Sequence, residues 1–228
     1  MKDYEVDFAA LDPAEKKSFL SSFGVAGFTP DAEFQEGLFA LLSHTRLLND
    51  LKGSDGEPPE IVQIAFEKLW ECLETGEMVI TPDLEAFQEC FEHAAGAFVH
   101  GDFGMLESDE DDAFYAQYFE NCDHVWEGFI DGLGHLCFDI VGRTGCAPER
   151  IAELIEWTVE PDIGHRILGL KSLTGTTSQQ EAWASEARET PEFCAVIARL
   201  QEDMKAAASG APVPELRERY QTRYLFSD

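Results

Sequence analysis

The sequence predicts an all-α protein, and three observations support this class. Four segments place a Thr or Asp before a proline, with an acid within two residues of it: Asp12-Pro13, Thr29-Pro30, Thr81-Pro82 and Thr190-Pro191. Apolar residues recur at spacings of three and four, as expected when one face of a helix is buried. The apolar–polar alternation that is typical of strands is nearly absent.

The cap-proline-acid pattern has a direct physical explanation. The Thr or Asp side chain accepts a hydrogen bond from an otherwise unpaired N–H of the first helical turn. Proline at the first helical position has no N–H to leave unpaired, and the acid lies at the positive end of the helix dipole. These signals predict a single irregular bundle of about 8–9 helices.

The helices are expected in the following order. Apolar spacing predicts three helices early in the chain, within 34–51, 61–73 and 82–99, with Gly76 just after the second. Ser108 should cap a long run that is broken or bent at three later glycines, Gly128, Gly132 and Gly134. Further helices are expected at 148–158, 162–173, 179–188 and 191–208. The likeness of TPDAEFQEGLF to TPDLEAFQECF leaves open a construction from helical hairpins.

The chain divides into a predicted acidic all-helical domain, residues 1–208, and a C-terminal part, residues 209–228. The C-terminal part opens with SGAPVP, which predicts a linker. A short basic-aromatic tail follows, with Arg217, Arg219 and Arg223 between tyrosines. This tail could form a patch of its own, but we expect it to dock across the acidic body, where its arginines relieve repulsion.

Charge is the most unusual property of the sequence, since 45 acidic residues against 16 basic ones give a formal net charge of −29. Such an excess destabilises a compact fold through self-repulsion. Solubility and recognition of a basic partner explain it equally well, and adaptation to high salt is a third explanation. Direct nucleic-acid binding is disfavoured because phosphates would be repelled.

The six cysteines form no C-x-x-C pair, which predicts reduced and mostly buried thiols. The opening residues, MKDYEVDFAALD, lack the apolar run of a secretion signal. The sequence contains no stretch of about 18 apolar residues, so no membrane span is expected. We therefore expect a cytoplasmic protein with no cofactor and no membrane partner.

The sequence contains only weak candidates for a metal site. His93 follows Glu89 by four residues and His124 follows Glu120 by four, so each pair can share a helix face. These ligand types suit zinc or iron. Because E-x-x-H and H-E-x-x-H are both absent, we predict no metal site, and these four residues are the ones that a metal-dependent helical enzyme would use.

Catalytic residues are not predicted. The sequence has no G-x-S-x-G, no phosphate-binding glycine loop and no cysteine in a recognisable catalytic context. We therefore expect a protein that is not an enzyme.

The acidic stretch ESDEDDAFYAQYF (107–119) is the strongest functional signal. Its four consecutive acids follow Ser108 at a predicted helix start, where negative charge is locally favourable. That preference explains part of the cluster but not the excess of acids along the whole chain. Helices hold carboxylates about 5–6 Å apart along a face, so rows of them can dock on a basic surface or imitate DNA phosphates.

Aromatic residues among the acids are candidate anchors for such docking, with core packing as the alternative for Tyr115, Tyr118 and Trp126. Other acids recur on predicted outer faces, and Glu71 and Glu74 are the second choices among them. The predicted partner-binding residues are Asp109, Glu110, Asp111, Asp112, Tyr115, Glu71 and Glu74.

Three segments, IAFEKLWECLETGE (64–77), ESDEDDAFYAQYFENCDHVWEGFIDGL (107–133) and ARETPEFCAVIARLQEDM (187–204), carry a resemblance. In their order they resemble the YjaG-like family of helical bacterial proteins of unknown function. The proline of that family's acidic segment is missing here, and residues 134–180 depart from its pattern. The resemblance implies an all-helical domain and implies nothing about activity.

The sequence therefore favours a binding role. The expected function is an acidic inhibitor, of the immunity or anti-defence type, that occludes a basic toxin, nuclease or nucleic-acid-binding complex. A DNA mimic that acts on a restriction or CRISPR-type complex is the first alternative, and a metal-dependent enzyme and a structural or chaperone-like protein are the others. The sequence leaves open whether the protein forms a homodimer.

Overall fold

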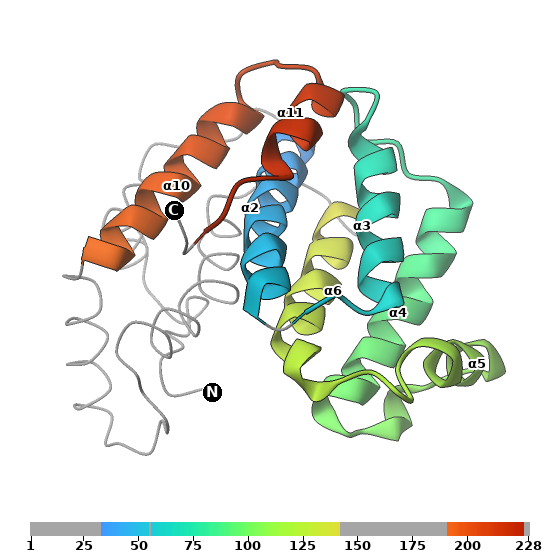
Figure 1. The fold of residues 1–228 in the computed structure, drawn as a ribbon. Coiled ribbons are helices and arrows are strands. Elements are labelled where there is room, and N and C mark those ends of the chain that lie inside the picture. Colours follow the sequence, from blue (N-terminus) through green and yellow to red (C-terminus); the bar gives the residue numbers. More distant parts are fainter. Residues whose placement is uncertain (1–32, 55, 142–190, 226–228) are drawn as a thin grey trace, which may run out of the picture.

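The computed structural model describes residues 33–54, 56–141 and 191–225, and this part of the chain is mainly helical, as predicted (Figure 1). The described part contains seven α-helices, two short 3₁₀ helices and no strand. The helices predicted at 148–158, 162–173 and 179–188, and the caps at Asp12 and Thr29, lie outside the described residues. The all-α class is confirmed.

The elements are the following. The α-helices are α2 (Glu33–Ser54), α3 (Glu60–Leu73), α4 (Pro82–His100), α5 (Asp109–Tyr118), α6 (Glu127–Val141), α10 (Pro191–Ala207) and α11 (Val213–Tyr220). The 3₁₀ helices are η2 (Phe103–Met105) and η3 (His124–Trp126).

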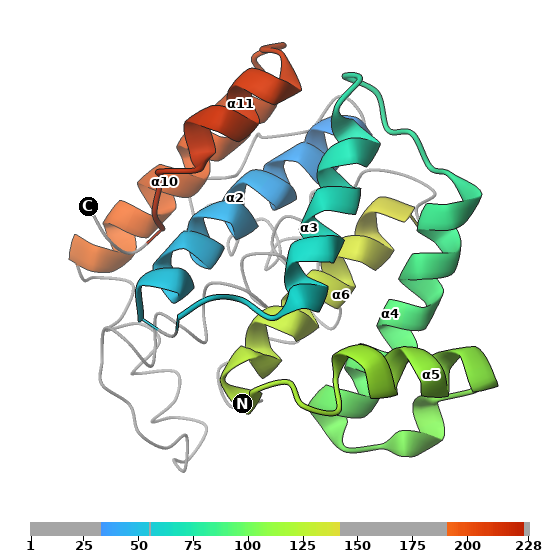
Figure 2. The ribbon, with the colours of Figure 1, turned by 45° about the vertical axis from the view of Figure 1, so that its right-hand side comes forward.

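Helices α2 and α6 form the centre of the bundle. Helix α6 packs against α2, α3 and α4, and α2 also packs against α10 and α11. Helix α5 lies against α4 on the side away from α10 (Figures 1 and 2). The core is apolar and rich in aromatic side chains, and Phe39, Phe91 and Phe119 are each at most 1% exposed.

Two predicted caps are present. The hydroxyl of Thr81 accepts a hydrogen bond from the backbone N–H of Leu84 over 3.2 Å, and that of Ser108 accepts from the N–H of Asp111 over 3.1 Å. Helix α10 begins at Pro191, directly after Thr190, and Gly76 adopts a φ of +83° beyond α3. The cap-proline-acid pattern therefore locates helix starts correctly wherever the structure describes them.

The prediction for the run after Ser108 was wrong in detail. The interruption lies between Phe119 and Trp126, and α6 continues through Gly128, Gly132 and Gly134. A glycine costs a helix only about 1 kcal/mol relative to alanine. Burial of one α6 face, which includes Phe129, Ile130 and Leu133, outweighs that cost.

The C-terminal segment packs into the same core as the preceding helices. Val213, Leu216, Tyr220 and Leu225 are buried among residues of the core. Arg217 pairs with Glu67 of α3, and Arg223 lies 3.4 Å from Glu202 of α10. The contacts agree with the expectation that this segment docks on the acidic body and that its arginines offset carboxylates.

A buried polar cluster holds this segment in place. Asp203, which is 0% exposed, accepts a hydrogen bond from Arg46 Nε over 2.8 Å and one from the hydroxyl of Tyr220 over 2.5 Å. Burial raises the pKa of Asp203 to about 6, although Arg46 and Tyr220 oppose the change. Burial and the Asp203 charge also raise the pKa of Tyr220.

Backbone groups beyond α11 are held as well. Arg46 donates to the carbonyl oxygen of Tyr224, and Asn49 donates to those of Tyr220 and Arg223. The N–H of Leu225 donates to Asp50 over 2.6 Å. Hydrogen bonds with α2 side chains therefore hold the backbone of residues 220–225 against α2.

Across the described residues, no helix has the length and apolar character needed to cross a membrane.

Candidate functional site

Negative charge is concentrated in one part of the chain. Between Lys52 and Arg143 the sequence carries 22 aspartates and glutamates but a single lysine, Lys68, and no arginine. This stretch contains α3, α4, α5 and α6. Lys68 is half-buried and its ammonium lies 5.1 Å from the centre of the Phe87 ring. We call the stretch between Lys52 and Arg143 the acidic lobe. A count of charge in windows along the sequence would have found it.

The first turn of α5 presents the densest group of carboxylates. Asp109, Glu110 and Asp112 are exposed, and none of the three takes part in an ion pair among the described residues. The Ser108 cap fixes the start of the helix, and the acids lie at its positive end. These three residues are among the candidates named from the sequence, and their side chains are exposed. We call them the α5 carboxylates.

Asp111 has a different position. It is only 2% exposed, and its Oδ2 accepts hydrogen bonds from the hydroxyl of Ser108 over 2.9 Å and the N–H of Glu107 over 3.1 Å. Nδ1 of His93, on α4, lies 3.1 Å from the same oxygen. Burial alone would raise the pKa of Asp111, but the hydrogen bonds and the His93 interaction lower it overall. Asp111 therefore joins α5 to α4 and has no free carboxylate face.

The aromatic candidates separate into core and surface. Trp126 is 3% exposed and belongs to the core, whereas Tyr118 and Tyr115 are half-buried. The Tyr115 ring stacks on Phe119 at 6.0 Å and meets Phe103 edge-on at 5.3 Å. Phe103, in η2, is 59% exposed, and sequence reasoning missed it because a three-residue 3₁₀ helix has no apolar periodicity.

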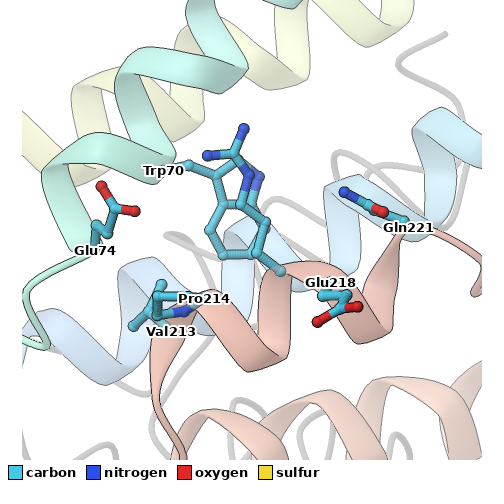
Figure 3. Close-up of a pocket in the computed structure, with 7 residues that line it drawn as sticks. Trp70, Glu74, Val213, Pro214, Glu218 and Gln221 are labelled. Carbon is cyan, nitrogen blue, oxygen red and sulfur yellow. The ribbon is translucent and has the colours of Figure 1, made fainter.

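The second-choice acids lie far from the first. Glu71 is near the end of α3 and Glu74 just beyond it, next to the turn into α4, whereas α5 follows the opposite end of α4 (Figures 1 and 2). Helix α4 has 19 residues. At 1.5 Å per residue it separates the two groups by about 28 Å. Glu71 and Glu74 are both exposed, and Glu74 borders a cavity between α3 and α11 (Figure 3).

The Cys90–His93–Asp111 arrangement does not favour nucleophilic catalysis. Burial raises the pKa of the Cys90 thiol, and the charges of Asp111, Glu89 and Glu110 raise it further. A nucleophilic cysteine needs a stabilised thiolate, which positive neighbours supply. Here the surrounding carboxylates favour the thiol form of Cys90.

The residues considered for a metal do not assemble. His93 faces Asp111, and Nδ1 of His124 pairs with Glu127, so neither histidine is paired with Glu89 or Glu120. Glu120 and His124 do not share a helix because α5 ends at Tyr118. Within the described residues, no three His, Cys, Asp or Glu side chains gather in a group that could hold a metal ion.

Comparisons with protein-family models, with curated proteins and with solved structures find no match for this chain. The functional argument therefore depends on the residues and the geometry.

Proposed function

We propose that this chain is an acidic binding protein that docks on the basic surface of another protein and occludes it. The observation that supports the proposal is the acidic lobe, in which 22 carboxylates accompany one lysine between Lys52 and Arg143. Within the lobe, α5 presents Asp109, Glu110 and Asp112 exposed and without an ion pair among the described residues. A basic toxin, nuclease or nucleic-acid-handling complex is the class of partner that this charge complements.

The negative field first speeds encounter. Complementary charge raises the association rate over the range of the Debye length, about 8 Å at physiological salt. The α5 carboxylates then meet basic side chains on a helix whose orientation is fixed by Ser108, Asp111 and His93. Because these contacts exist before binding, little ordering entropy is lost when the partner arrives.

Phe103 supplies the apolar contact that charge alone lacks. Interface energy concentrates in a few aromatic and arginine anchors, surrounded by polar contacts. Phe103 and Tyr115 form such an aromatic pair beside the α5 carboxylates, and Phe103 is 59% exposed. In the proposed complex, Phe103 enters an apolar depression of the partner while the carboxylates pair with its rim.

The cytoplasm is the proposed site of this encounter. The thiols of Cys72, Cys90 and Cys122 are free, which suits a reducing compartment.

Affinity capture with a matched control tests the proposal. The immobilised protein, a D109N/E110Q/D112N variant and an E77Q/D83N/E85Q variant are exposed to the same lysate. Both variants lose three exposed charges, but the control changes lie at the other end of α4. We expect the wild type and the control to retain proteins with isoelectric points above about 9, and the α5 variant to lose them. Equal retention by all three would contradict the proposal.

Competition separates an inhibitor of one dedicated partner from a DNA mimic. Duplex DNA added to the captured complex releases the partner if the acidic lobe occupies its DNA site. A partner that binds DNA and this protein together favours the dedicated inhibitor.

A further inference from the structure

A cavity of about 120 Å³ opens between the end of α3 and helix α11 (Figure 3). Its apolar wall consists of Trp70, Val213 and Pro214, and Gln221 contributes an amide. Glu74, beyond the end of α3, and Glu218, on α11, border it from different sides (Figure 3). The cavity therefore combines a narrow apolar wall with carboxylates at its edge.

The lining is negative despite the presence of an arginine. Arg217 also borders the cavity, but its guanidinium lies 5.7 Å from the centre of the Trp70 ring and pairs with Glu67, outside the cavity. Glu74 and Glu218 are exposed and take part in no ion pair among the described residues. An anion would thus meet two uncompensated carboxylates, whereas a cation would be attracted.

The cavity has room for a slender cation. A water molecule occupies about 30 Å³ in the liquid, so this cavity has room for about four of them. The five heavy atoms of a lysine side chain need similar space. Its aliphatic stem can lie against Trp70, Val213 and Pro214, because lysine combines an apolar stem with a charged tip. Its ammonium can approach Glu74 or Glu218, which border the cavity from different sides (Figure 3).

We propose that this cavity is a binding site for a lysine side chain of the basic partner. The inference rests on the proposed function, since that partner supplies the lysine. It adds a second point of attachment, separated from the α5 carboxylates by the length of α4, about 28 Å. Two points at this distance require the partner's basic groups to match in position as well as in charge, which gives specificity that a diffuse acidic surface lacks.

The test uses the full chain, labelled with ¹⁵N, and a capped hexalysine peptide as the probe. The indole N–H of Trp70 reports the cavity, and the backbone N–H groups of α5 report the acidic surface. The E74Q/E218Q variant removes both carboxylates of the cavity. The E60Q/E215Q variant is the matched control, because it changes two exposed residues, one on α3 and one on α11, that do not line the cavity.

We expect the peptide to shift the Trp70 indole resonance saturably, and the dissociation constant read from it to rise about fivefold in E74Q/E218Q and less than twofold in the control. An unmoved Trp70 resonance, or equal constants in both variants, would overturn the inference. If the peptide still shifts the backbone N–H resonances of α5 in that case, the proposed function stands without the cavity. If the Trp70 resonance shifts but the α5 variant captures the same partners as the wild type, the cavity is supported and the proposed function fails.

Discussion

Asp203 lies where α2, α10 and α11 meet, and its charge is balanced chiefly by Arg46. Two charges removed from water are costly, and their attraction repays the cost only when the geometry is good. Here both oxygens of Asp203 lie within 3.1 Å of Arg46 Nε. Arg46 therefore joins α2 to α10 through Asp203, and to the C-terminal segment through the carbonyl oxygen of Tyr224.

The substitution Arg46→Met tests this connection. Methionine keeps much of the apolar stem but leaves Asp203 buried and uncompensated. We expect a loss of about 3–5 kcal/mol in the free energy of unfolding at pH 7. Urea denaturation measures it. Glu202→Gln is the control, since Glu202 is exposed and its removal should cost less than about 1 kcal/mol. A similar loss in both variants would show that the buried pair has no special weight.

The raised pKa of Asp203 predicts a pH dependence of stability. With a pKa of about 6 in the folded protein and about 3.9 in the unfolded chain, the folded state binds the proton more tightly between those values. This group therefore adds stability as pH falls from 7 towards 4. We compare the free energy of unfolding of the wild type with that of Asp203→Asn at each pH. The wild type's advantage over the variant should be about 1 kcal/mol larger at pH 5 than at pH 7. A difference that grows with rising pH would contradict the assignment.

Substitution of Asp111 should affect the stability of α5 more than substitution of its exposed neighbours. Asp111→Ala removes the acceptor shared by Ser108, Glu107 and His93, and should destabilise α5 by about 1–2 kcal/mol. Because the folded pKa is lowered, this contribution is lost as pH falls through that pKa. Hydrogen exchange of the α5 amides measures the effect. Asp112→Ala, which changes an exposed neighbour, should leave exchange nearly unchanged, and equal effects would refute the distinction.

Part of this difference was readable in the sequence. Ser108 followed three residues later by Asp111 fits the capping-box spacing, in which the third residue turns back to the helix start. Because Asp111 lies within a run of four acids, the sequence pattern alone indicates an exposed residue like its neighbours. The contact with His93 was not predictable, since it depends on how α5 packs across α4.

At the scale of the elements, local chemistry predicted helix starts better than helix breaks. Thr81, Ser108 and Pro191 mark helix starts because a cap acts through bonds within a few residues. The break between Phe119 and Trp126 depends on tertiary packing, because both side chains are buried in the core on either side of the turn. Glycine spacing alone therefore indicated the wrong place.

Two glycine substitutions test this interpretation of α6. Gly128 is exposed within the first turn of α6, and a Cβ there would meet nothing within 4 Å. Gly128→Ala should therefore raise the free energy of unfolding by about 0.5–1 kcal/mol. Gly101, which ends α4 with a φ of +65°, is the contrasting case, and Gly101→Ala should lower it by about 1 kcal/mol. Thermal unfolding of both variants checks the signs. A destabilising Gly128→Ala would mean that α6 needs a bend there.

At the scale of the whole molecule, charge is separated between two regions. The acidic lobe carries 22 carboxylates and one lysine, whereas the C-terminal segment supplies Arg217, on α11, and Arg223, beyond it, which pair with Glu67 and Glu202. The sequence predicted a docking face because of the net charge. It did not predict that the candidate acids form two groups at opposite ends of α4, since this follows from the opposite directions in which α3 and α4 run (Figure 2).

The most direct test of the central claim is the salt dependence of affinity for a captured basic partner. Titrations at about 50 and 200 mM salt compare the wild type, D109N/E110Q/D112N and E77Q/D83N/E85Q. If α5 is the docking surface, its variant should bind at least about tenfold more weakly at low salt, and with a smaller salt dependence, than the equally charged control. Identical affinities and salt dependences for the two variants would mean that the carboxylates act only through their number, and would contradict a defined docking surface.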